Sequence, residues 1–152
     1  MDQSFSDQKT RIPDKDSYSL NLTTLSYSAA FKDHIAHPRN AGDLPDANAT
    51  AEQTNPVCGD RLRLTLSIRD GRIEAARFLA YGCPATLACG SALAEMLEGI
   101  TVEDAMKLTR KEIVSAVGGL PTRKQHAAAL AIETLRAAIE NSGGAASQKP
   151  DR

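Results

Sequence analysis

The sequence contains no tryptophan, and aromatic residues make up only 4% of its 152 residues. A hydrophobic core must therefore rely on leucine, isoleucine, valine and alanine, and stacking platforms for bases or sugars are not expected. The sequence also lacks any run of five like charges, and its 18 basic residues nearly balance its 19 acidic ones. This balance argues against a basic binding surface, so no nucleic-acid partner is predicted.

Long apolar runs are absent as well, because no stretch approaches the roughly 20 apolar residues that span a bilayer. The first 16 residues are polar and include four aspartates. This composition matches neither the apolar core of a secretion signal nor the acid-poor bias of an organelle transit sequence. We therefore expect no membrane association and a cytoplasmic location.

Cysteine is scarce, with 3 residues at positions Cys58, Cys83 and Cys89. An odd number of cysteines, in a chain too long to need a disulfide scaffold, favours a reducing compartment and metal or thiol chemistry. Candidate functional residues are therefore expected around these thiols.

The length of the chain is enough for one compact domain with tails. Residues 1–26 and 142–152 are polar segments of low complexity, which bury too little apolar surface to offset the entropy of ordering. Both are predicted to be disordered tails. The predicted domain comprises residues 27–141.

Periodicity predicts the elements of this domain. Strict alternation of apolar and polar residues predicts a strand at 61–69, the Asp70-Gly71 pair favours a hairpin turn, and residues 72–81 form the returning strand. Helices are predicted after the Ser28 cap up to about Pro38, from Pro84 to about Gly99, after Thr101, after Thr109, and over roughly 122–141. The sequence therefore predicts an α+β fold, with a small antiparallel sheet of about three strands and a central hairpin packed against several helices.

The hairpin gives this fold a candidate site. An antiparallel hairpin returns the chain to the end where it began, so Cys58 and Cys83, which flank it, are expected to lie close together. Each cysteine has a neighbouring glycine, which permits close approach to a bound group. Asp60 could add a carboxylate oxygen. Cys83 precedes a predicted helix, whose N-terminus favours the thiolate form. The alternative interpretation is that both cysteines are buried as small hydrophobic residues.

Four further residues can be weighed against this site. His126 lies in the basic start of the last predicted helix, where it is either a ligand or an ordinary surface histidine. Cys89 lies six residues after Cys83, a helical rise of about 9 Å, whereas two thiolates on one metal approach within about 4 Å. A core position is therefore favoured for Cys89, with a role as an additional thiol as the alternative. His34 and His37 are expected to be surface residues or supports.

Four segments in order carry a resemblance to a known family: YSAAFKDHIAHPRNAG at 27–42, VCGD at 57–60, ARFLAYGCPATLACGSALAEML at 76–97 and LPTRKQHAAALAIETLRAAI at 120–139. Together they resemble the iron-sulfur cluster assembly scaffold family, the NifU N-terminal or IscU-like proteins, over essentially the whole predicted domain. The resemblance implies a protein that assembles or carries a 2Fe-2S cluster on three cysteines, helped by an aspartate and a histidine.

Matched position by position, the resemblance implies that Cys58, Asp60, Cys83 and His126 bind the cluster or its iron. The third cysteine of the family directly follows the histidine, and this chain has Ala127 there. The chain can still offer two sulfurs, one oxygen and one nitrogen, and mixed Cys/His ligation is known in Rieske-type centres. A labile cluster, a cluster shared between two chains, and a single zinc or iron ion are all compatible with this set.

The resemblance also implies partners. It predicts a cysteine desulfurase as sulfur donor and apo iron-sulfur proteins as recipients, with the chain itself a monomer or homodimer. The LPTRK segment at 120–124 lacks the second proline and the apolar residue of the loop that the family's dedicated chaperone recognises. Recognition by that chaperone is therefore not expected.

Three functions remain open at this point. The first is a non-enzymatic scaffold or carrier for an iron-sulfur centre or its iron. The second is a zinc-bound sulfur-transfer protein that accepts a persulfide from a cysteine desulfurase. The third is an enzyme with Cys83 as nucleophile and His126 as base, for which the sequence offers no orienting partner.

Overall fold

The computed structural model describes residues 27–56 and 59–142 of the chain. Predictions for segment 1–26, for Cys58 and for residues 143–152 lie outside this described part. In chain order the described elements are α4 (Ala29–Ala36), β1 (Ala49–Thr54), β2 (Arg61–Arg69), β3 (Arg72–Tyr81), α5 (Pro84–Leu97), α6 (Val102–Met106), α7 (Arg110–Ala116), the 3-10 helix η2 (Thr122–Lys124) and α8 (His126–Glu140). The predicted α+β fold with a small antiparallel sheet is confirmed.

The sheet has the strand order β1-β2-β3, and both neighbouring pairs are antiparallel. The two strands predicted at 61–69 and 72–81 form the central hairpin with those bounds. Asp70 and Gly71 make the turn with positive φ angles of 53° and 75°, a conformation that this residue pair tolerates better than most. The alternation in the sequence was therefore sufficient to place the hairpin.

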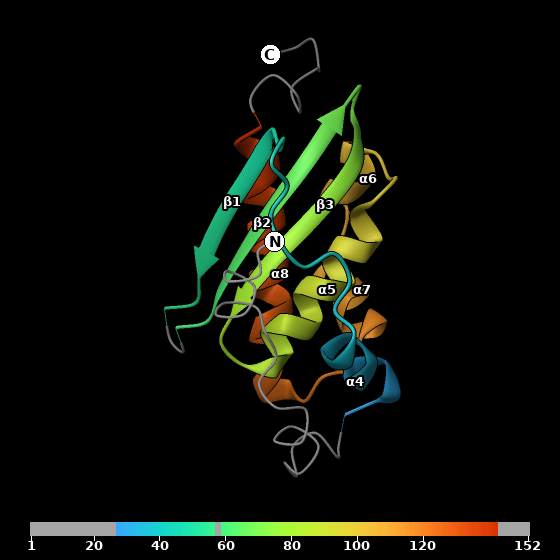
Figure 1. Cartoon of the computed structure of the whole chain (residues 1–152). Coiled ribbons are helices and arrows are strands. Elements are labelled where there is room, and N and C mark those ends of the chain that lie inside the picture. The colour runs from blue at the N-terminus through green and yellow to red at the C-terminus, as the bar shows by residue number, and fades with distance from the viewer. Residues whose placement is uncertain (1–26, 57–58, 143–152) are drawn as a thin grey trace.

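Helices α5 and α8 pack against the sheet, α5 mainly on β3 and α8 on β1 and β2 (Figure 1). A glycine lets α5 approach closely, because a Cβ atom on Gly90 would lie only 2.6 Å from the Phe78 ring. Phe78 and Leu62 are both fully buried beneath this helix. The core therefore lies between the sheet and these two helices.

Two elements differ from the sequence predictions in their detail. Strand β1 was not located from sequence, because its inward residues Ala49 and Ala51 are too small to give an apolar alternation. The last predicted helix, at about 122–141, is divided into η2 and α8, so that a new helix begins at His126. This division places His126 in the first turn of a helix.

The ends of several elements gather at one end of the sheet (Figure 1). Strand β1 ends there at Thr54, β2 begins at Arg61, and β3 ends at Tyr81. Helix α5 starts from the same end because it directly follows β3. Within the described residues, no helix has the length and apolarity needed to cross a membrane.

Candidate metal centre

Three of the residues singled out in the sequence lie together in the structure. Asp60, Cys83 and His126 each offer one ligand atom, and these three atoms all lie within 4.8 Å of one another. Asp60 directly precedes β2, Cys83 is the N-cap of α5, and His126 is the first residue of α8. The hairpin flanks and the start of the last helix therefore converge, as the candidate site requires. Cys58 lies outside the described residues.

Backbone hydrogen bonds in the loop between β1 and β2 fix Asp60. The Asn55 N–H donates to the Asp60 carbonyl at 2.7 Å, and the Gly59 N–H donates to the Asn55 carbonyl at 2.7 Å. Gly59 makes this loop with a φ of 81°, which glycine adopts without the steric cost that a Cβ atom brings. The loop thus turns Asp60 back towards the end of β3.

The Asp60 carboxylate is buried, with 6% of the residue exposed, and holds the site together through its two oxygens. Its Oδ1 accepts from the Cys83 N–H at 3.3 Å. Its Oδ2 accepts from the Thr86 hydroxyl at 2.9 Å and from the Cys83 thiol at 3.3 Å. Such bonds offset the cost of removing a carboxylate from water.

Gly82 makes room for this carboxylate. A Cβ atom on Gly82 would overlap the Asp60 side chain, and its φ of 130° is one that other residues rarely adopt. The glycine beside Cys83 was expected to permit close approach of a bound group; in the structure, the group beside it is the Asp60 side chain.

The two ring nitrogens of His126 face different partners, one a backbone carbonyl and the other the Asp60 carboxylate. Its Nδ1 lies 3.1 Å from the Arg123 carbonyl, and its Nε2 lies 3.5 Å from Asp60 Oδ2. Because a carbonyl oxygen can only accept, the first contact places a proton on Nδ1. In the neutral ring Nε2 is then the nitrogen that can bind a metal, and the carbonyl orients the ring as in many metal sites.

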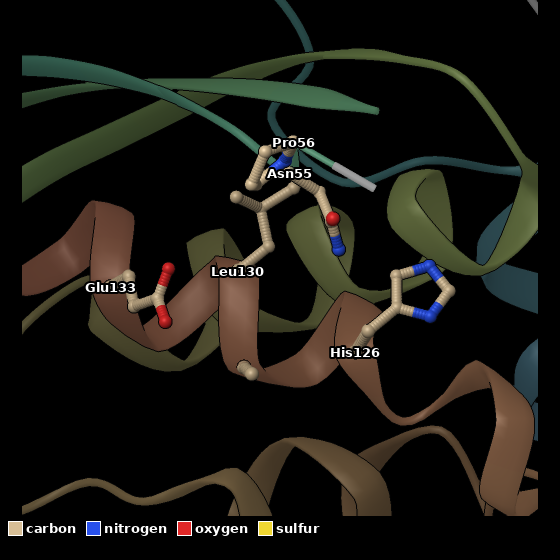
Figure 2. A pocket seen from close by; sticks show the side chains of 6 residues that line it. Asn55, Pro56, His126, Leu130 and Glu133 are labelled. Carbon is tan, nitrogen blue, oxygen red and sulfur yellow. The ribbon is translucent and has the colours of Figure 1, made fainter. Parts of the chain in front are cut away.

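The site opens beside a shallow cavity of about 210 Å³. Its lining residues are Asn55, Pro56, His126, Ala129, Leu130 and Glu133. Figure 2 shows the Asn55 side chain extending from the end of the sheet towards the His126 ring. His126 is partly exposed here, with 31% of its side chain accessible, and Cys83 is also partly exposed. A bound ion would therefore be within reach of solvent.

Cys89 lies away from this group. It is fully buried in α5, within the hydrophobic core, and burial raises the pKa of its thiol far above the usual range. The described ligand group does not include it. The preferred interpretation of Cys89 as a core residue agrees with this placement.

Ala127 is also fully buried. Its side chain belongs to the hydrophobic core, whereas the neighbouring His126 is partly exposed at the site. The position where the resemblance implies a third cysteine therefore has a core methyl group, and no sulfur is available from it.

His34 corrects a sequence expectation. Of the two expected roles, surface residue or support, the surface position is wrong, because only 5% of His34 is exposed and its Nδ1 lies 2.7 Å from Ser91 Oγ. Burial, and then the charge of Arg39, lowers the pKa of His34. This contact could not be predicted from residue types, because Ser91 lies 57 residues away in the sequence. His37, by contrast, is exposed as expected.

Thr86, whose hydroxyl contacts Asp60, was not predicted from the sequence. The available signal was a polar residue three positions after Cys83, in a segment that is otherwise mostly apolar. The contact of His126 with the Arg123 carbonyl was not predicted either, because a backbone partner leaves no signature in the residue types.

The donor set of the site is one carboxylate oxygen, one sulfur and one imidazole nitrogen. Zinc accepts all three kinds of ligand, and thiolate together with imidazole also suits iron. The residues present therefore fit a metal ion or an iron-sulfur centre.

The sequence model of the NifU-like N terminal domain family matches residues 26–147. The chain belongs to this family. It is 42% identical over 113 residues to "Iron-sulfur cluster assembly scaffold protein IscU 1" of Archaeoglobus fulgidus, a match that covers 74% of each chain. It is 38% identical over 120 residues to "Iron-sulfur cluster assembly scaffold protein IscU" of Aquifex aeolicus, covering 78% of this chain and 76% of that one. The resemblance inferred from four segments is thereby confirmed.

Solved structures share the fold. The crystal structure of a "Putative iron-sulfur cluster assembly scaffold protein for SUF system" from Fervidobacterium islandicum superposes with a TM-score of 0.65 at 20% identity, covering 76% of this chain and 98% of that one. A NifU-like N-terminal structure from Brucella abortus gives a TM-score of 0.63 at 15% identity, covering 90% and 99%. The arrangement of sheet and helices is therefore that of the NifU-like and IscU-like scaffolds.

Proposed function

We propose that the protein is a non-enzymatic scaffold or carrier that holds a 2Fe-2S cluster, or the iron for one, through Asp60, Cys83, His126 and Cys58. The observation that carries the proposal is the convergence of three ligand atoms within 4.8 Å, from three separate segments, in a chain of the NifU-like family. The named relatives are themselves assembly scaffolds. The cluster is cargo in this account, made on the protein and passed on.

The donor set favours a weakly held cluster that can be transferred to another protein. Iron-sulfur clusters are most often held by four thiolates, whereas the proposed set has two, Cys58 and Cys83, because position 127 is an alanine. An oxygen and a nitrogen would complete the set, and both are harder ligands than thiolate. Because Cys83 and His126 are partly exposed, a recipient protein could reach the cluster directly.

The same exposure supports the proposed partners. A cysteine desulfurase would deliver sulfur at Cys83, and recipient apo iron-sulfur proteins would remove the finished cluster. A reducing compartment such as the cytoplasm would keep the cysteines as free thiols.

A zinc-bound sulfur-transfer protein is the second candidate. The observation that favours it is the donor set, because sulfur, nitrogen and carboxylate oxygen are the usual ligands of a zinc ion. In this case the metal would hold the thiolate, and Cys83 or Cys58 would accept the persulfide.

Metal and sulfide analysis after anaerobic purification tests these functions. We expect iron and acid-labile sulfide in equal amounts after reconstitution with iron and a desulfurase, with visible thiolate-to-iron absorption bands. One colourless zinc per chain would favour the second candidate instead, and a chain that takes up neither metal would refute both.

Two histidine variants supply a matched control. His126→Ala should lose most of the cluster, whereas His37→Ala, the same change at an exposed position outside the ligand group, should bind like the wild type. Equal loss in both variants would contradict the assignment of His126.

A further inference from the structure

Thr86 is a fully buried residue in the first turn of α5, and its hydroxyl reaches two groups of the candidate site. It donates to Asp60 Oδ2 at 2.9 Å, and its Oγ1 lies 3.7 Å from Cys83 Sγ. The bond to Asp60 joins residues 26 positions apart in the sequence. Thr86 therefore contacts two proposed ligands while being shielded from solvent itself.

Thr134 shows what a buried threonine does elsewhere in this protein. It is also fully buried and helical, and its hydroxyl donates to the Leu130 carbonyl at 2.7 Å, one turn earlier in α8. This local bond is the common arrangement for threonine within a helix. The Thr86 hydroxyl instead donates to the Asp60 carboxylate on another segment. Its hydrogen bond therefore belongs to the candidate site and not to its own helix.

We propose that Thr86 is a positioning residue that sets the orientation of the Asp60 carboxylate for metal binding. The Cys83 N–H holds Oδ1 at 3.3 Å and the Thr86 hydroxyl holds Oδ2 at 2.9 Å, so donors on both oxygens oppose rotation of the carboxylate. In this orientation Oδ2 lies 3.3 Å from Cys83 Sγ and 3.5 Å from His126 Nε2. The oxygen then faces the other two ligand atoms. This inference rests on the proposed function.

Titration of the full chain with Co²⁺ alone, under anaerobic conditions, tests the proposal. Outer partners of metal ligands typically contribute about 10- to 100-fold in affinity. We expect Thr86→Val, which keeps the shape and removes the hydroxyl, to weaken Co²⁺ binding by a factor in this range and to alter the cobalt absorption bands. Thr86→Ser, which keeps the hydroxyl, should bind with close to wild-type affinity.

Thr134→Val is the matched control, since it makes the same change at an equally buried helical threonine. It should leave cobalt affinity and spectrum unchanged, even where it lowers the unfolding temperature. Thr86→Ala and Thr86→Ser serve as a second pair if the valine variant folds poorly. Both lose the methyl group and only Thr86→Ala loses the hydroxyl, so the difference in their cobalt affinity measures the effect of the hydroxyl.

The outcomes separate this inference from the proposed function. Equal affinity of the wild type and Thr86→Val, or equal weakening by Thr86→Ala and Thr86→Ser, would overturn the role of Thr86 and leave the metal site standing. A wild-type chain that binds no Co²⁺ would overturn the metal site and the role of Thr86 together.

Discussion

Replacing Gly82 by alanine would test how the fold holds Asp60 in the site. The new Cβ atom would overlap the Asp60 carboxylate, and alanine would have to adopt a φ of 130°. Backbone strain of this kind costs about 1–3 kcal/mol. If the carboxylate moves away, each hydrogen bond lost to it costs about 1.5–3 kcal/mol more. We therefore expect Gly82→Ala to lower the free energy of unfolding by about 3 kcal/mol or more, and to weaken metal binding.

Gly42→Ala is the control for backbone strain. Gly42 has nearly the same φ, 127°, but a Cβ atom there would meet only the Arg77 side chain at 3.9 Å, an ordinary contact. Urea unfolding of the metal-free proteins measures the difference, and Co²⁺ titration measures the effect on the site. Equal losses of stability in both variants, with unchanged cobalt affinity in Gly82→Ala, would refute the inference that glycine at position 82 provides the space for the Asp60 carboxylate.

The remaining predictions concern the thiols, the buried histidine and a helix cap. Cys58→Ala and Cys83→Ala should each abolish cluster binding, whereas Cys89→Ala should keep it and cost about 1–3 kcal/mol of stability; equal metal loss in all three would contradict the core role of Cys89. Burial lowers the pKa of His34 in the folded chain, so this histidine takes up a proton at higher pH in the unfolded chain than in the folded one. The free energy of unfolding should therefore fall as the pH drops below about 6.5. His34→Gln should flatten that part of the pH profile, and an unchanged profile would argue against it. Thr109 and Glu112 form a capping box, so Thr109→Ala should lower stability by about 0.5–2 kcal/mol in thermal unfolding; an unchanged unfolding curve would count against the cap.

Much of the fold could be predicted because its strongest signals are local. The alternation around Leu64 and the Asp70-Gly71 turn fixed the hairpin, and the hairpin in turn brought the flanking residues Asp60 and Cys83 together. Strand β1 escaped prediction because it packs with small alanines and gains its place by pairing with β2. Pairing of this kind depends on the partner strand, which periodicity within the segment does not reveal.

The candidate site was predictable as a set of residues and not as an arrangement. Residue types and the resemblance pointed to Asp60, Cys83 and His126, and the structure brings their ligand atoms together. The contacts that orient them are long-range or involve the backbone, as with Thr86 and the Arg123 carbonyl. Such contacts appear only once the chain is folded.

X-ray absorption at the iron edge of the loaded chain tests most directly whether oxygen, sulfur and nitrogen from these segments share one metal centre. We predict a mixed shell of sulfur and lighter atoms, with the imidazole contribution lost in His126→Ala and kept in His37→Ala. A shell of sulfur alone, or a spectrum identical in wild type and His126→Ala, would contradict it.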